Sequence, residues 1–272
     1  MSENYFELTV KTASHAEIFS DFLLTFTNAV EENDGILILR SEEPLDIIEF
    51  GVKEYAKRLG IEVETAVVQK PNEDWVKKYQ ESVQPISVGA FYIRPSWKEP
   101  KEGFTDIVIN PALAFGSGHH ESTYGCLLMA QRYINIGSRM LDVGTGSGIL
   151  AIAASKLGAI ADICDTDEQA LISAKENFFQ NGVKHKNAWI GSVNGVKKYA
   201  NDIKYNIITA NIIADVLLAI KNDLANVLHE EGILILSGIL DKYVKQIKEC
   251  YAPLILIDEF KANEWRTLVY KR

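Results

Sequence analysis

The chain has 272 residues, of which 47% are hydrophobic and 24% are charged, which excludes a disordered chain and indicates a globular protein of one or two domains. The net charge of −9 and an isoelectric point near 5.2 argue against direct nucleic-acid binding, because clustered Lys and Arg hold a phosphate backbone; a small molecule or a basic protein is the better partner. Three scattered cysteines, the lack of a basic leader before an apolar run, and the lack of an apolar stretch of bilayer length predict a cytoplasmic protein with no disulfide framework, no metal and no membrane span.

Residues 1–70 predict a small α+β domain. The expected strands are Tyr5–Val10, Gly35–Leu39 and Ile61–Val68, and the expected helices are Ser14–Glu32, opened by Ser14, and Pro44–Gly60. The second helix has proline near its start and glycine at its end. Two helices among short strands indicate a compact module with the helices on one face of a sheet.

Residues 71–103 predict a connector between two domains. This stretch holds four of the seven prolines together with Trp75 and Trp97, which we expect to be core anchors more than substrate contacts. A short helix at Asn72–Glu81 and strands at Pro85–Val88 and Phe91–Ile93 are expected.

Residues 104–272 alternate between strand and helix patterns, as in a doubly wound α/β domain. The expected strands are Arg139–Val143, Ile160–Cys164, Asn187–Ile190, Tyr205–Ala210, Gly232–Leu236, Pro253–Phe260 and Trp265–Tyr270. The expected helices are Ser147–Gly158, Asp167–Asn181, Ile213–Leu228 and Asp241–Tyr251. Repeated β-α units predict a mostly parallel, seven-stranded, Rossmann-like sheet with helices on both faces. The last two strands follow one another without a helix, so one strand is expected to be antiparallel.

A glycine-rich loop joins the first of these strands to its helix. Gly144, Gly146 and Gly148 alternate along the loop, and Asp142 precedes them. A dinucleotide site favours G-x-G-x-x-G, but Ile149 occupies the position of its third glycine. The pattern resembles motif I of the class I methyltransferases. That resemblance implies that the loop binds S-adenosylmethionine, and that Asp142 helps to hold the ammonium group of this donor.

Two further strand ends offer polar side chains. Asp165 ends the second strand of the domain, where an ionised carboxylate can accept both ribose hydroxyls. Asp167 is expected to cap the following helix. Ser192 follows the third strand, where adenine usually rests in this fold, although a simple turn serine explains this residue equally well.

Other motifs resemble the PrmA family, the methyltransferases of large-subunit ribosomal protein eleven. They are Glu73–Trp75, Ile93–Trp97, Asn110–Thr123 (N-P-A-L-A-F-G-S-G-H-H-E-S-T), Asn211–Ala214 and Leu236–Leu240, in order along the chain towards Trp265. The third motif departs from the family pattern D-P-G-L-A-F-G-T-G-x-H-P-T-T at Asn110, Ala112 and Glu121, whereas His120 and Thr123 match. These departures concern the local shape of the loop and its affinity for the donor.

The resemblance implies an enzyme that methylates lysine side chains and the N-terminal amine of that ribosomal protein. It carries over Thr123, Gly144, Asp165 and Asn211 as donor-site residues, a substrate-recognising N-terminal domain and a monomeric state. Asn211 is expected to orient the amine through its side-chain carbonyl, as the catalytic residue, because an amide is not a general base; a strand-end cap is its alternative. His120 is expected to shape the loop or line the pocket.

Three other functions stay open at this stage. A class I methyltransferase with another protein or a small amine as acceptor would share the donor motifs. A nicotinamide-dependent oxidoreductase is disfavoured by Ile149, and a donor-binding domain without catalysis is disfavoured by the Asn211 motif.

Overall fold

A computed structural model describes residues 4–12, 15–27, 30–33, 35–71, 83–110 and 120–272, in two compact units, Met1–Val83 and Gln84–Arg272. The division falls within the predicted connector. The expected helix Asn72–Glu81 lies outside the described residues, as do Ser14 and most of the Asn110–Thr123 motif.

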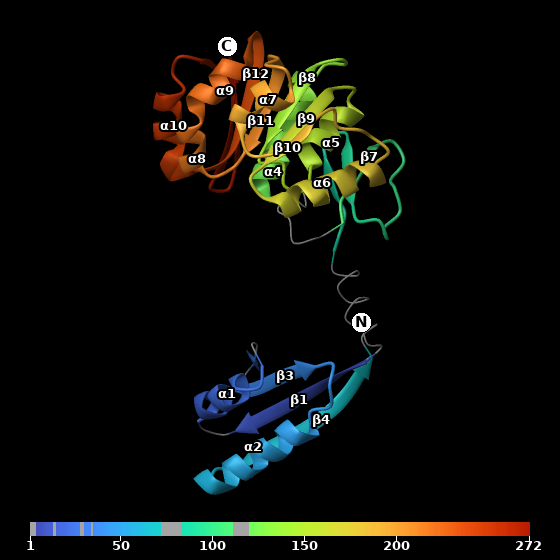
Figure 1. The fold of residues 1–272 in the computed structure, drawn as a ribbon, viewed down its shortest axis with the longest axis vertical. Coiled ribbons are helices and arrows are strands. Elements are labelled where there is room, and N and C mark those ends of the chain that lie inside the picture. Colours follow the sequence, from blue (N-terminus) through green and yellow to red (C-terminus); the bar gives the residue numbers. More distant parts are fainter. Residues whose placement is uncertain (1–3, 13–14, 28–29, 34, 72–82, 111–119) are drawn as a thin grey trace. The chain divides into compact units, whose positions relative to one another are not determined.

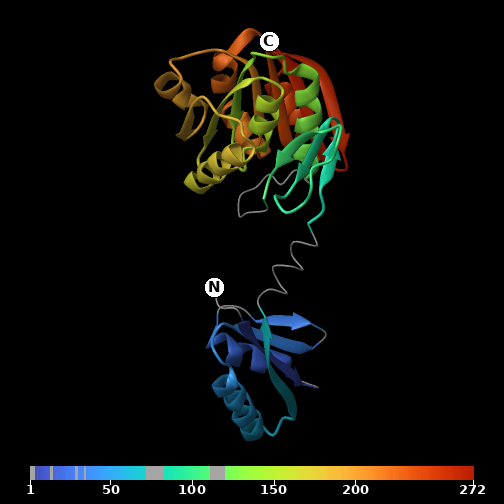
Figure 2. The same cartoon turned by 90° about the vertical axis from the view of Figure 1, so that its right-hand side faces the viewer.

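The N-terminal unit is a four-stranded antiparallel sheet with two helices on one face (Figures 1 and 2). Its elements are β1 (Asn4–Thr12), α1 (Ala16–Leu24), β2 (Glu31–Asn33), β3 (Ile36–Ser41), α2 (Asp46–Leu59) and β4 (Val63–Pro71), and the strand order is β2-β3-β1-β4. Alternate residues of β1 and β3, such as Leu8 and Leu39, pack against Phe19 of α1 and Val52 of α2. The predicted packing of two helices on one face of a sheet is therefore confirmed.

The predicted helix Ser14–Glu32 is wrong in its second half. Helix α1 ends at Leu24, and the hydroxyl of Thr25 donates to the carbonyl of Phe22 at 2.7 Å. Residues 31–33 instead pair with β3 as an antiparallel edge strand. Glu and Asn are depleted in strands and Glu favours helices, so pairing with the neighbouring strand overrode the local preference of this segment. Helix α2 ends as expected, at Gly60 with φ 68°.

The second unit contains a seven-stranded sheet of order β10-β9-β8-β11-β12-β14-β13. Its strands are β8 (Arg139–Val143), β9 (Ile160–Asp165), β10 (Ala188–Ile190), β11 (Tyr205–Asn211), β12 (Leu228–Leu240), β13 (Ile255–Ala262) and β14 (Trp265–Lys271). Strand β14 runs opposite to the other six and therefore pairs antiparallel with both β12 and β13. The predicted doubly wound, mostly parallel sheet with one antiparallel strand is confirmed.

Helices cover both faces of this sheet. Its helices are α4 (Glu121–Tyr133), α5 (Ile149–Lys156), α6 (Glu168–Gln180), α7 (Val196–Tyr199), α8 (Ala214–Ala219), α9 (Lys221–Val227) and α10 (Val244–Cys250), with short 3-10 turns at Val193–Gly195 and Asp241–Tyr243. One buried cluster unites the sheet with α4, α5 and α6, and a second unites it with the other four helices. In each cluster, side chains from alternate positions of β8 contribute to the core.

A small three-stranded sheet completes this unit. It contains β5 (Ile86–Val88), β6 (Phe91–Arg94) and β7 (Thr105–Val108). The sequence did not predict β7 or α4, and the predicted helix Ile213–Leu228 is broken at Ile220, which has φ −95° and ψ 8°.

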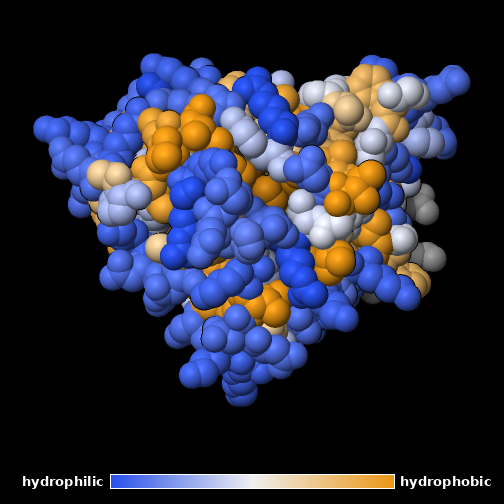
Figure 3. All heavy atoms as spheres, turned by 90° about the horizontal axis from the view of Figure 1, so that it is seen from above, coloured by the Kyte–Doolittle hydropathy of each residue, from blue (hydrophilic) through white to orange (hydrophobic). Residues whose placement is uncertain are grey.

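The exposed hydrophobic residues on the face shown in Figure 3 form several separate groups among hydrophilic ones, as on an ordinary water-exposed surface. Within the described ranges, no helix is long and apolar enough to cross a membrane.

Candidate active site

A cavity of about 650 Å³ lies at the carboxyl ends of the parallel strands. It lies where the strand order reverses, between β9-β8 on one side and β11-β12 on the other, which is the usual place for a ligand in an open α/β sheet. Its lining comprises His120, Ser122, Thr123, Gly144, Thr145, Gly146, Ile149, Leu150, Asp165, Thr166, Asp167, Ala170, Ser192, Asn211, Ile212, Ile213, Val216, Gly238 and Trp265. The volume is in the range of small-molecule and cofactor sites.

The glycine loop forms one wall of the cavity, as its position after β8 predicts. Gly144 and Gly146 line the cavity, and a Cβ on Gly144 would lie 2.4 Å from Cγ2 of Ile212. Gly148 is not among the lining residues. It caps α5, and a Cβ there would lie 3.1 Å from that of Ala174, so this glycine permits α5 to pack closely on α6.

Asp142 lies beneath the loop and not on the cavity wall. It is 1% exposed, and its two carboxylate oxygens accept hydrogen bonds from the hydroxyls of Thr145 at 2.8 Å and Thr209 at 2.6 Å. Burial raises the pKa of Asp142 to about 6, although these two hydrogen bonds oppose the shift. In this structure Asp142 therefore holds the loop against β11, and its predicted contact with an ammonium group remains a prediction.

Asp165 lies at the end of β9 and lines the cavity. Its carboxylate accepts hydrogen bonds from the amides of Gly146 at 2.9 Å and Asp167 at 3.0 Å, which fix its orientation. Each carboxylate oxygen can accept a further hydrogen bond, so two acceptor positions stay available for a ligand diol. Asp167 caps α6 through the amide of Gln169, as predicted. Ser192 also lines the cavity, after β10.

Asn211 and Thr123 meet on the other side of the glycine loop. The Asn211 side-chain amide donates to the Thr123 hydroxyl at 3.1 Å, although the two residues are 88 positions apart in the sequence. The Oδ1 atom of Asn211 is buried, and no described group donates a hydrogen bond to it. A buried acceptor without a donor costs free energy, so this oxygen is available to a ligand that brings an N–H.

His120 forms the N-terminal cap of α4 beside this pair. Its Nδ1 accepts from the amide of Ser122 at 3.3 Å, and its ring meets Trp265 edge to face at 4.6 Å. Both rings line the cavity, as expected for a pocket residue at His120. The hydroxyl of Ser237 in β12 donates to the carbonyl of Ser122 at 3.0 Å and so ties the start of α4 to the sheet.

The sequence did not single out several lining residues. Gly238 interrupts β12 with φ 77°, and a Cβ there would lie 2.5 Å from the carbonyl oxygen of Ile212. A glycine within an apolar strand signals such a close backbone approach, so this residue could have been found from its position in Leu236–Leu240. Nothing in the local sequence placed Trp265 at the cavity, because its position depends on the antiparallel β14.

The part of the chain that the structure describes contains no group of three or more His, Cys, Asp or Glu side chains that could hold a metal ion.

Comparison with known proteins agrees with this geometry. The family model described as ribosomal protein L11 methyltransferase (PrmA) matches residues 8–272. Proteins named ribosomal protein L11 methyltransferase from Nitratiruptor sp. and Campylobacter fetus are 46% and 44% identical, over 100% of this chain and 97% and 98% of theirs. A crystal structure of ribosomal protein L11 methylase from Lactobacillus delbrueckii subsp. bulgaricus matches with a TM-score of 0.64 and 31% identity, over 70% of this chain and 99% of that chain. The chain therefore belongs to the PrmA family, on a class I methyltransferase fold.

Proposed function

We propose that this protein transfers methyl groups from S-adenosylmethionine to amino groups of ribosomal protein L11, on lysine side chains and at the N-terminus. The observation that carries the proposal is the pairing, in one cavity, of the fixed carboxylate of Asp165 with the unpartnered Oδ1 of Asn211. Membership of the PrmA family supplies the acceptor, because the relatives named above carry this activity in their names.

The residues on one side of the cavity suit the donor. Asp165 would accept the ribose hydroxyls, Ser192 would lie near the adenine, and Gly144 and Gly146 would let the donor approach the backbone closely. Thr123, held by Asn211, would complete the donor site from the start of α4. When bound, S-adenosylmethionine supplies an activated methyl group, because its sulfonium is an excellent leaving group.

The residues on the other side suit an amine. The amine nitrogen would attack the methyl carbon of the bound donor in line, and the electron pair of the carbon–sulfur bond would go to sulfur. The chain therefore mainly aligns the two partners. Asn211 would accept an N–H of the amine through Oδ1 and direct its lone pair, since an amide cannot act as a general base at neutral pH.

The acceptor amine must first lose a proton. A lysine side chain in water, with a pKa of roughly 10.4, is mostly charged at neutral pH. Ile213 and Val216 give the cavity an apolar wall beside Asn211, and partial desolvation there would lower the pKa of the lysine amine. The released proton would pass to water.

The N-terminal unit would recognise the ribosomal protein, and the second unit would hold the chemistry. The expected cytoplasmic location belongs to the same proposal, since the acceptor is a ribosomal protein, and the monomeric state is what the family resemblance implies.

Intact-mass spectrometry of purified ribosomal protein L11, incubated with this protein and S-adenosylmethionine, tests the proposal. The expected result is a mass gain in whole methyl steps that depends on the donor. The Asn211→Ala variant should give a much slower gain, while its donor affinity in calorimetry should fall far less than that of an Asp165→Ala variant. Donor binding without any gain in mass would favour another protein or a small amine as acceptor, and the loss of both would refute the proposed donor site.

A further inference from the structure

The net negative charge of the chain belongs entirely to its N-terminal unit. Residues 1–83 contain 17 acidic and 8 basic side chains, which is a net charge of −9, whereas residues 84–272 contain 20 of each. The second unit, which holds the cavity, is therefore neutral. A net charge concentrated on one unit attracts an oppositely charged partner to that unit and accelerates their association.

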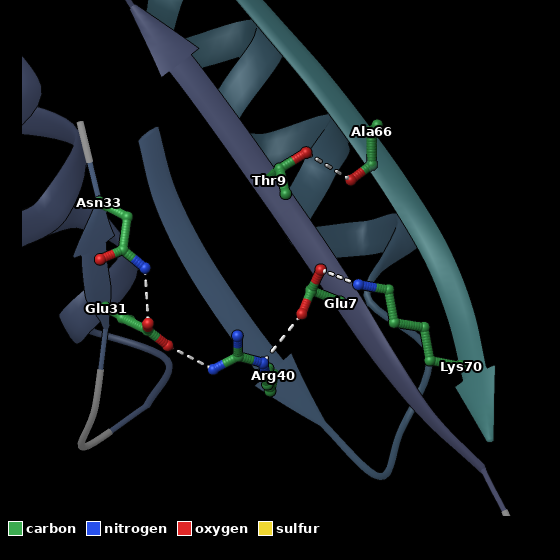
Figure 4. A network of polar contacts seen from close by, with 7 residues as sticks. All are labelled: Glu7, Thr9, Glu31, Asn33, Arg40, Ala66 and Lys70. Atoms are coloured by element: carbon green, nitrogen blue, oxygen red, sulfur yellow. Dashed lines mark hydrogen bonds and ion pairs between the residues drawn. The ribbon is translucent and has the colours of Figure 1, made fainter. Parts of the chain in front are cut away.

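On the face of the N-terminal sheet that the helices do not cover, the charged side chains pair with one another. Glu7 on the central strand β1 is only 7% exposed, and it accepts from Arg40 of β3 at 2.9 Å and from Lys70 of β4 at 2.6 Å (Figure 4). Arg40 also binds Glu31 of β2 at 2.5 Å, so one network links all four strands. Charges that are satisfied in this way offer little to a partner.

The helical face differs in its charges. Five acidic residues have no ion-pair partner among the described residues. Glu17 and Asp21 lie in α1, Glu42 and Glu43 lie just before α2, and Asp46 is the first residue of α2. The basic residues Lys57 and Arg58 lie at the other end of α2, as the helix dipole favours. Three of these five acids, Glu42, Glu43 and Asp46, lie within residues 42–46 at the start of α2.

The same region exposes large apolar side chains. Ile47 is 85% exposed and Phe50 is 65% exposed, and their spacing of three places both on one side of α2. Phe22 of α1 reaches this side, because its Cζ lies 3.3 Å from the position of a Cβ on Gly51, and it meets the exposed Phe26 edge to face at 5.3 Å. Exposed aromatic and aliphatic side chains of this kind are typical anchors of a protein interface.

We propose that this helical patch, formed by Phe26, Ile47 and Phe50 with Glu43 and Asp46 at the start of α2, docks a basic and partly apolar surface of the substrate protein. The proposal rests on the function proposed above and adds the place of recognition. The acceptor amines are themselves cations at neutral pH, so a substrate surface rich in lysine complements this acidic rim. The apolar anchors would supply affinity, and the acids would supply orientation and rate.

Binding of ribosomal protein L11 to the full chain, measured by calorimetry at two salt concentrations, tests the proposal. The double variant Ile47→Ser, Phe50→Ser should bind at least about tenfold more weakly. The double variant Glu43→Lys, Asp46→Lys should also weaken binding and should reduce its dependence on salt. Affinity for S-adenosylmethionine should be unchanged in both variants, because the donor cavity belongs to the second unit.

Two control variants separate this patch from the rest of the unit. Val68→Ser removes an apolar side chain, 49% exposed, from the open face of the sheet, and Glu62→Lys makes a similar charge change at an exposed position before β4. Both should bind the ribosomal protein nearly as well as the parent chain. Equal weakening by Val68→Ser, or unaltered binding by both patch variants, would overturn the proposal.

The methylation assay distinguishes failure of the docking surface from failure of the function. If the parent chain methylates the ribosomal protein and the patch variants do so with unchanged KM, only the docking surface is refuted. If the parent chain neither methylates nor binds it, both proposals fall. If it binds without methylation and the patch variants lose binding, the docking surface stands and the reaction needs another acceptor.

Discussion

Replacement of Gly238 by alanine should slow methyl transfer by displacing Asn211 and its neighbours. Gly238 has φ 77°, and the added Cβ would lie 2.5 Å from the carbonyl oxygen and 3.0 Å from the carbonyl carbon of Ile212. A carbon–oxygen contact needs about 3.3 Å, so the two backbones must separate by roughly 0.8 Å. Because the obstacle is backbone, no side-chain rotation can relieve the contact.

The consequence for rate follows from the position of Ile212, directly after Asn211. A misplacement of about 1 Å can cost roughly a hundredfold in rate, so Gly238→Ala should lower kcat by about ten- to a hundredfold. Donor affinity should fall less, because Asp165 lies at the end of β9, which β8 separates from β11 and its following Ile212. Steady-state kinetics with ribosomal protein L11 and calorimetry with S-adenosylmethionine measure the two effects.

Gly137→Ala provides the matched control for backbone strain. Gly137 has φ 81°, but a Cβ there would meet nothing within 4 Å. Both variants should lose about 1–2 kcal/mol of unfolding free energy from the left-handed conformation alone, and only Gly238→Ala should lose activity in the folded protein. If kcat of the Gly238 variant stays within about twofold of the Gly137 variant, the reasoning is refuted.

Three further predictions concern acidic residues. Burial raises the pKa of Asp142 to about 6, so the protonated side chain stabilises the folded state fully below the unfolded pKa of about 3.9. This stabilisation, roughly 3 kcal/mol, is lost as the pH rises to about 6. Asp142→Asn should remove this slope from the free energy of unfolding plotted against pH, and an unaltered slope would contradict the assignment. Asp165→Ala should weaken donor binding at least about tenfold in calorimetry through lost hydroxyl contacts, and normal affinity would exclude the ribose role. Burial opposes the shift, but hydrogen bonds from Lys70 and Arg40 lower the pKa of Glu7, so its stabilisation is present above the unfolded pKa and is lost as pH falls through the folded one. Glu7→Gln should therefore lower the free energy of unfolding by about 1–3 kcal/mol at neutral pH. The lower end of this range is expected, because Lys70 is 43% exposed and solvent screens its ion pair. At low pH, denaturant unfolding should give the same free energy for the variant and the parent chain.

The sequence predicted the parallel sheet well because each buried strand carries its own apolar run and ends at a polar residue or a glycine. Asp165 was predicted from that position, Asn211 was predicted from that position together with the resemblance to the PrmA family, and both line the cavity. The residues that were missed depend on partners distant in the chain. Trp265 reaches the cavity through the antiparallel pairing of β14 with β12, and local periodicity carries no signal for that pairing.

Helix α4 shows a second limit of the sequence pattern. Seven of its residues, Ser122, Thr123, Gly125, Cys126, Leu127, Met129 and Ala130, are buried, so it has no simple polar face. A helix buried on several sides lacks the amphipathic period on which prediction relies. Residues 31–33 show the opposite case, since their exposed, acidic sequence has no apolar period and only pairing with β3 makes them a strand.

The spacing of the glycine loop now has a physical explanation. In a dinucleotide site, the third glycine of G-x-G-x-x-G permits close packing of the helix, and here Ile149 occupies that position and is buried in the core. Gly148 serves the same need one residue earlier, because its missing side chain admits Ala174 of α6. The loop therefore keeps the glycine that packing requires and shifts its position, while Gly144 and Gly146 remain free to face the ligand. The motif differs from the dinucleotide one in the element approached, because the third glycine there lets the helix pack on a strand, whereas Gly148 lets α5 pack on α6.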